Sequence, residues 1–333
     1  MLKNFSLLCV LLLAIYSNAK AQTKVKRKMQ KTEKNAMLCD TATGMCELPG
    51  HDDHVANKQT AAVNKAVKIV YYTDPICSSC WGIEPQLWKL KLEYGHEIEV
   101  EYRMGGLLPS WEIYNSGGIS KPSDVAAHWD EVSHHYEMPI DGDVWLEDPL
   151  PSSYPPSIAF KAAQLQDKDK ALAFMRRIRE MVFLEKKNIT KWEHLATAAQ
   201  ETGLDVVQLK QDYEGKAVQL FEEDLAMARG AGVRGFPTLI LTNKDGEQTM
   251  LRGSRPYKEF EAGITKLAPA AHRKPISTDR TAVLKKFKTI TAKEYAVMFD
   301  ISFAQAEKEL KELEEKKVVS RYDTKNGAIW RMK

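Results

Sequence analysis

The stretch VKIVYYTDPICSSCWG, residues 67–82, decides the fold of this chain. Its β-branched and aromatic first half predicts a buried strand, which Asp74-Pro75 ends. Apolar residues then recur at helical spacing, so a helix is expected as far as Tyr94. A Cys-x-x-Cys pair between a strand and a helix is typical of thioredoxin-like redox proteins.

Cys77 is expected at the N-terminus of this helix, with Cys80 one turn further along. Unpaired N–H groups and the positive end of the helix dipole stabilise a thiolate there. We therefore expect Cys77 to be the attacking nucleophile and Cys80 the resolving thiol. An inert disulfide and half of a metal site are the alternatives. A zinc ribbon would need a second ligand pair, and no cysteine follows Cys80.

The residues around this unit predict an α/β domain. Residues 98–104 alternate as a second strand, and residues 238–251 form two strands around an Asp-Gly turn, before a closing helix at 257–267. This order predicts a thioredoxin-like fold over residues 66–268, with a helical insertion at about 120–231. Within the insertion, helices are expected near 122–136, 155–166, 168–187, 191–202 and 204–229.

Pro237 stands immediately before an apolar strand. In thioredoxin-like folds a cis-proline loop at this position faces the CxxC pair. We predict that the Phe236-Pro237 bond is cis and that Pro237 packs against Cys77. A trans proline at the start of a strand is the alternative.

Three motifs together resemble the DsbA family of thiol-disulfide oxidoreductases, with the FrnE/YjbH-like branch the most similar. They are DPICSSCWG (74–82), MGGLLP (104–109) and GVRGFPT (232–238), in the family's order. The resemblance covers about residues 66–268. It implies a thioredoxin fold with a helical insertion.

The resemblance also implies a function and a site. The expected function is that of an exported thiol-disulfide oxidoreductase that acts on protein thiols or disulfides, needs no cofactor and uses an unknown redox partner. The direction of the reaction, oxidase or isomerase/reductase, stays open, because the dipeptide between the cysteines lacks the Pro-His of strong oxidases. Some YjbH-like members are adaptors, so a non-catalytic adaptor is the alternative. The implied catalytic residues are Cys77 and Cys80, and the implied substrate-binding residues are Phe236, Pro237 and Trp81.

Cys39 and Cys46 are predicted to form a second disulfide, on an arm that precedes the core. Three roles are open: a structural staple, a redox pair that exchanges with the CxxC, and a metal site with His51 and His54. We favour exchange over the staple and predict no metal ion. The turn-rich CDTATGMC loop makes the disulfide labile, and the chain itself tethers it to the CxxC.

The two ends of the chain differ from the core. Residues 22–65 are polar and basic, which predicts a flexible arm. Residues 280–333 predict three helices and two strands, which together resemble a winged helix. Lysines on its last helix alternate with glutamates, so a protein-interaction or dimer module is favoured over DNA binding.

Residues 1–21 predict a secretory signal peptide, with Lys3 before an apolar run and Ala19-Lys20-Ala21 as the cleavage site. An uncleaved anchor is the alternative. Cleavage would leave 46 basic and 45 acidic residues, a near-neutral balance that argues against a nucleic-acid partner. The expected location is the periplasm or another extracytoplasmic compartment, with no membrane span after cleavage. The histidines at 128, 134 and 135 are expected on a solvated helix face.

We predict that the exported protein begins at Gln22, because the A-x-A site ends at Ala21. N-terminal sequencing and intact mass of the protein from its native host measure this directly. An amino terminus at Met1 in a membrane fraction would support the anchor instead.

Overall fold

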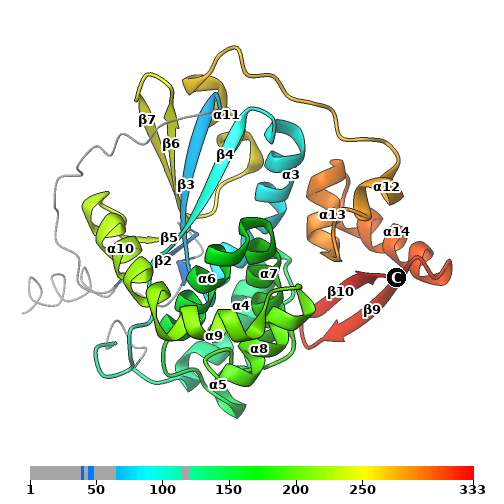
Figure 1. Ribbon diagram of the computed structural model, residues 1–333. Coiled ribbons are helices and arrows are strands. Elements are labelled where there is room, and N and C mark those ends of the chain that lie inside the picture. The colour runs from blue at the N-terminus through cyan, green and yellow to red at the C-terminus, as the bar shows by residue number, and fades with distance from the viewer. Residues whose placement is uncertain (1–38, 41–43, 49–64, 115–119) are drawn as a thin grey trace, which may run out of the picture.

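The computed structural model describes residues 39–40, 44–48, 65–114 and 120–333. A four-stranded sheet lies at its centre, in the order β4-β3-β6-β7 (Figure 1). Strand β3 pairs in parallel with β4 and antiparallel with β6, and β7 pairs antiparallel with β6. This mixed sheet joins a βαβ unit to a hairpin, which is the thioredoxin-like arrangement predicted from the sequence. The strand bounds are β3 (Val67–Thr73), β4 (Ile98–Met104), β6 (Thr238–Asn243) and β7 (Gln248–Arg252).

The helix expected after the cysteines is two helices, α2 (Ser78–Gly82) and α3 (Glu84–Tyr94). Pro85 stands in the first turn of α3. It has no N–H with which to continue the hydrogen bonds of α2, so the chain begins a new helix there. Helix α3 packs beside α11 (Tyr257–Leu267), and α11 also packs on β6 and β7.

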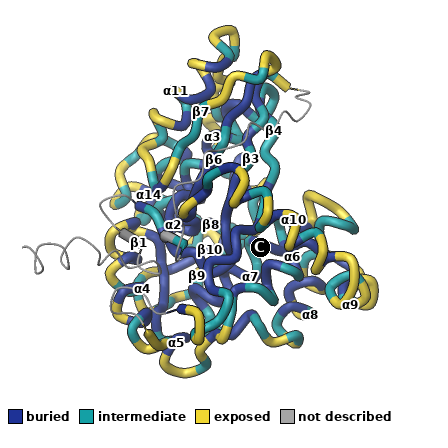
Figure 2. Tube along the Cα trace, turned by 90° about the vertical axis from the view of Figure 1, so that its left-hand side faces the viewer, coloured by how far each residue is buried: buried dark blue, intermediate teal, exposed yellow. Residues whose placement is uncertain are grey.

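The insertion is helical, as predicted, but two of its elements differ from the expectation. The single helix expected over 204–229 is broken at Gly215, between α9 and α10. Helix α5 was missed because four residues carry no measurable periodicity. Figure 2 shows the outer turns of α9 as exposed and the central strands as largely buried. The helices are α4 (Ser123–Tyr136), α5 (Val144–Glu147), α6 (Tyr154–Gln166), α7 (Lys168–Leu184), α8 (Trp192–Glu201), α9 (Val206–Glu214) and α10 (Lys216–Gly230).

The C-terminal residues form a small module with its own core, in which Tyr295, Leu310 and Trp330 are buried. Its helices and two long strands match the winged-helix-like expectation. A third strand of three residues, β8, completes the sheet in the order β8-β10-β9 and was not predicted. The elements are α12 (Arg280–Leu284), β8 (Thr289–Thr291), α13 (Ala292–Phe299), α14 (Phe303–Glu315), β9 (Val319–Thr324) and β10 (Gly327–Met332).

A buried ion pair joins this module to the thioredoxin-like part. The Arg176 guanidinium on α7 donates to both carboxylate oxygens of Glu294 on α13, at 2.5 and 3.1 Å. The same guanidinium lies 4.5 Å from the ring centroid of Trp81 and 4.6 Å from that of Trp88. Glu294 also accepts the backbone N–H of Thr291 in a capping box. One cation therefore contacts both parts of the molecule.

We expect Glu294→Gln to lower the free energy of unfolding by about 3 kcal/mol or more, because the buried Arg176 loses its closest anion. Glutamine keeps the capping-box acceptor, so the variant tests the charge. Glu259 on α11 is half-exposed and pairs with Arg255 at 3.7 Å. The control variant Glu259→Gln should cost less than about 1 kcal/mol in urea unfolding. Equal losses in the two variants would contradict the assigned role of the buried pair.

The prediction for the histidines of α4 was right for two residues and wrong for one. His134 and His135 are exposed, whereas His128 is only 9% exposed. It lies next to Trp129 on the inward face of α4, where helical spacing also buries Val125 and Val132. Burial lowers the pKa of His128 from 6.5 to about 4.

The lowered pKa of His128 gives a pH dependence of stability. Between pH 6.5 and 4 the unfolded chain binds a proton that folded His128 does not. The wild type should therefore lose about 3 kcal/mol of unfolding free energy relative to His128→Gln as the pH falls through this window. His134→Gln, on the exposed face, is the matched control and should track the wild type. Parallel curves for the wild type and His128→Gln would refute this.

Candidate functional site

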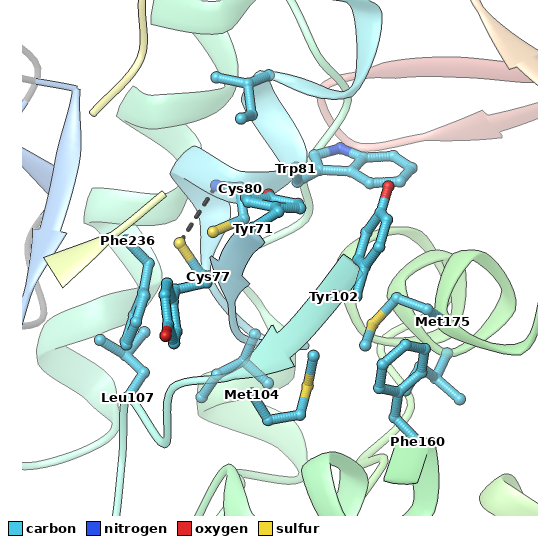
Figure 3. Packing of buried hydrophobic residues seen from close by; sticks show 14 of the residues in the cluster. Tyr71, Cys77, Cys80, Trp81, Tyr102, Met104, Leu107, Phe160, Met175 and Phe236 are labelled. Atoms are coloured by element: carbon cyan, nitrogen blue, oxygen red, sulfur yellow. Dashed lines mark hydrogen bonds between the residues drawn. The ribbon is translucent and has the colours of Figure 1, made fainter. Parts of the chain in front are cut away.

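The CxxC pair lies at the start of α2, as predicted. Cys77 is the N-cap residue of α2, and its Sγ accepts the backbone N–H of Cys80 at 3.2 Å. Both cysteines are free thiols, and both are fully buried. Figure 3 shows the two sulfurs on the same side of the helix, with Phe236 close to Cys77.

The Phe236-Pro237 peptide bond is cis, as predicted. Phe236 belongs to the short strand β5 (Gly235–Phe236), and both Phe236 and Pro237 are buried. The ring of Phe236 lies over Gly105, where an added Cβ would come within 1.8 Å of the ring. Gly105 thus permits the close packing of the proline loop against the end of β4.

The arm before the core supplies a hairpin to this site. Strand β1 (Cys39–Asp40) pairs with β2 (Met45–Glu47), and the backbone of Cys39 lies opposite that of Cys46. Strand β2 in turn pairs antiparallel with β5, with Cys46 opposite Phe236. Cys46 is disulfide-bonded, and its Sγ lies 3.3 Å from the Sγ of Cys77. The structure therefore brings the second cysteine pair directly to the first.

The metal alternative for this arm involved His51 and His54, which lie outside the described residues. Among the residues that the structure describes, one other group could hold a metal ion. His96, Glu97 and His272 offer ligand atoms that lie within 4.8 Å of one another. Nitrogen and carboxylate donors of this kind suit zinc. This group joins the α3–β4 turn to the linker and includes no cysteine.

Asp74 is a buried carboxyl beneath the CxxC loop. It accepts hydrogen bonds from the backbone N–H of Ile76 at 3.0 Å and of Leu107 at 2.8 Å, and from the hydroxyl of Ser153 at 2.8 Å. Burial raises the pKa of Asp74 to about 6, against the opposing effect of these hydrogen bonds. Its bonds to Leu107 and Ser153 fix the GGLLP loop beneath the cysteines.

The two thiols differ in acidity, and not in the expected order. Burial raises the pKa of Cys77 well above its usual value, and a hydrogen bond with Cys80 adds to this. Burial opposes ionisation of Cys80 too, but the bond from Cys77 and the Arg179 guanidinium lower its pKa. Both sulfurs are buried, so the difference comes from their mutual hydrogen bond, which favours the thiolate of Cys80, and from the Arg179 guanidinium beside it.

Trp81 was predicted to bind substrate, but it is fully buried. Its indole N–H donates to the carbonyl of Pro139 at 3.1 Å, and its ring stacks on Phe183 with centroids 5.5 Å apart. The residue thus lies in the core and contacts the Arg176 guanidinium on its other side. Trp81 is therefore linked to the C-terminal module indirectly, through Arg176 and its partner Glu294.

Arg179 was not predicted from the sequence as a residue of this site, and it is 1% exposed. It pairs with Glu84 and donates to the Thr73 hydroxyl at 2.7 Å and to the Asp74 carbonyl at 3.2 Å. A charged residue on the apolar face of α7 was the available signal. Its partners lie about a hundred positions away in the chain, so spacing alone could not identify them.

Within the described residues, no helix is long and apolar enough to cross a membrane. The predicted signal segment, residues 1–21, lies outside them.

Some known proteins are similar to this chain in sequence, and others are similar to it in fold. The family described as Thioredoxin matches residues 71–262. The ClpXP adapter protein SpxH of Halalkalibacterium halodurans is 34% identical over 304 residues, which cover 89% of this chain and 97% of that protein. SpxH of Bacillus subtilis strain 168 is 30% identical, over 80% of this chain and 89% of that protein.

Two solved structures show the same fold at low identity. A protein of Nitrosomonas europaea has a TM-score of 0.51 at 20% identity, covering 61% of this chain and 96% of its own. The cytosolic disulfide reductase DsbM from Pseudomonas aeruginosa has a TM-score of 0.50 at 21% identity, covering 60% of this chain and all of its own.

These relatives correct the expected function. The sequence predicted an oxidoreductase enzyme of the FrnE/YjbH-like branch, but the curated relatives that match nearly the whole chain are adapters. The prediction of a catalytic oxidoreductase was therefore wrong, whereas the predicted DsbA-like fold was right. The burial of both thiols and the position of the hairpin against Cys77 agree with this correction. The chain belongs to the thioredoxin family and, within it, to the family of the ClpXP adapter protein SpxH.

Proposed function

We propose that this chain is a protein adaptor, which binds a protein partner and delivers it to a protease of the ClpXP type. The observation that carries the proposal is the similarity to SpxH over 97% of that protein's length. A match of this extent spans both the thioredoxin-like part and the C-terminal module.

The attachment of the C-terminal module supports an adaptor role. Besides the Arg176–Glu294 pair, Lys325 in the β9–β10 turn donates to Asp130 at 2.6 Å and to Asp143 at 2.7 Å. The two parts are therefore joined at two separate places. An adaptor accelerates proteolysis by holding its partner near the protease, which raises the effective concentration of the two. A fixed spacing of the two parts serves that task.

The covered cysteines also support the proposal. Neither Cys77 nor Cys80 has exposed surface, and the β1–β2 hairpin lies over the sulfur of Cys77. A protein substrate of an oxidoreductase must reach that sulfur. Binding of a partner at the outer surface of the molecule needs no such access.

The predicted signal segment bears on the compartment in which the chain would meet its partner and the protease. The protein partner and the protease must meet the chain where it resides. We propose an extracytoplasmic location from the signal segment, and fractionation of the native host with an antibody to the mature chain tests it. A cytoplasmic pool would place the delivery step there.

Adaptor function should survive the loss of both CxxC thiols. Proteins whose half-life lengthens both in a strain lacking this chain and in a strain lacking the protease are the candidate partners. One of them, purified, should be degraded at least about tenfold faster when the chain is added, which corresponds to about 1.4 kcal/mol. The variant Cys77→Ser/Cys80→Ser should match the wild type within about twofold.

Two results would overturn the adaptor proposal. The first is that no protein is stabilised in both strains. The second is that the folded Cys77→Ser/Cys80→Ser variant delivers nothing. Circular dichroism and the unfolding midpoint of the variant separate loss of function from loss of fold.

A further inference from the structure

The β1–β2 hairpin occupies the edge of the strand that carries the cis-proline. Backbone hydrogen bonds seat it there: Leu48 N–H donates to the Arg234 carbonyl and Ser254 N–H donates to the Gly44 carbonyl, each at 2.7 Å. Gly44 has a φ of +61°, and a Cβ at this position would lie 2.4 Å from the Cβ of Ser254. The hairpin thus binds as an extended peptide adds to a sheet edge, in one fixed register.

This register places the disulfide-bonded Cys46 next to the free thiol of Cys77. Cys46 is disulfide-bonded and 1% exposed, and its Sγ is 3.3 Å from the free thiol of Cys77. Thiol-disulfide exchange requires a thiolate to reach a disulfide sulfur, and the identity of the sulfur within reach decides which bond forms. Here the sulfur within reach of Cys77 is that of Cys46.

We propose that the hairpin disulfide and the CxxC are an intrachain exchange pair, in which Cys77 attacks Cys46. In the first step Cys77 loses its proton and its sulfur bonds to the sulfur of Cys46. The bond from Cys46 to its partner breaks, and the partner, Cys39 by the predicted pairing, leaves as a thiolate that takes up a proton. In the second step Cys80 loses its proton and its sulfur bonds to that of Cys77. The Cys46–Cys77 bond breaks, and Cys46 leaves as a thiolate that takes up a proton.

The two steps conserve electrons within one chain. The hairpin disulfide is reduced and the Cys77–Cys80 disulfide is formed, so that no external oxidant or reductant takes part. The exchange needs no protein substrate, and it stands or falls independently of the adaptor role. After it, the hairpin is held to β5 by backbone hydrogen bonds, without its own covalent closure.

The acidities of the two thiols predict which of the two steps is slower. The raised pKa of Cys77 keeps the first attacking group protonated at neutral pH, so the first step should be slow. Arg179 favours the thiolate of Cys80, so the second step should be fast. The mixed disulfide between Cys46 and Cys77 should therefore not accumulate in the wild type. Replacing Cys80 removes the second step and should trap this intermediate.

The test uses the full chain with Cys80→Ser, with Cys77→Ser as the matched control. Each protein is purified oxidised, incubated at pH 6, 7 and 8, quenched in acid, alkylated and digested for mass spectrometry. Cys80→Ser should accumulate a peptide linking Cys46 to Cys77, with Cys39 alkylated. The rate should rise about tenfold per pH unit, because the thiolate fraction does. The rate should not depend on protein concentration.

Cys77→Ser should retain a linkage between Cys39 and Cys46 at every pH. Persistence of that same linkage in Cys80→Ser at pH 8, with Cys77 alkylated, would overturn the proposal. A rate proportional to protein concentration would also overturn it, because the exchange would then be between chains. If Cys80→Ser does not fold, as judged by circular dichroism, Cys80→Ala supplies the same readout.

Discussion

Two arginines one turn apart on α7 link the cysteine site to the C-terminal module. Arg176 points to the C-terminal module and Arg179 to the CxxC side of the sheet. Both guanidinium groups are largely buried, and a buried charge without an anion is strongly destabilising. Glu294 and Glu84 must therefore lie where they do. Helix α7 fixes the cysteine site and the module relative to each other through these two pairs.

The sequence predicted the fold wherever periodicity and turn chemistry were strong. The strand–CxxC–helix stretch, the Asp-Gly hairpin and the proline before β6 each carry a local signal, and the structure confirms them. Short elements such as α5 and β8 carry no such signal. The break at Pro85 was foreseeable from its missing N–H, but the apolar spacing continues across it and hides it.

The sequence predicted which cysteines form the site, but it did not predict which residues surround and bury them. Cysteine spacing identified Cys77 and Cys80, but accessibility depends on which segment covers them. For Cys77 that segment is the hairpin, whose pairing with β5 joins residues nearly two hundred positions apart. Both thiols are buried, and the hydrogen bond between them raises the pKa of Cys77 and, together with the Arg179 guanidinium, lowers that of Cys80, against the expected order. For the same reason the motif overstated catalysis, since a DsbA-like sequence describes the scaffold and not the exposure of its thiols.

The position of the hairpin also bears on how the molecule behaves at high concentration. A strand edge with free N–H and C=O groups is a template on which another chain can pair. Strand β2 covers the edge of β5 by antiparallel pairing, and the bonds at Leu48 and Gly44 extend that cover to both sides. A chain that lost its first fifty residues to proteolysis would keep its sheet and its module, and would gain an open edge. Self-association of the trimmed protein, and not its unfolding, is the expected consequence.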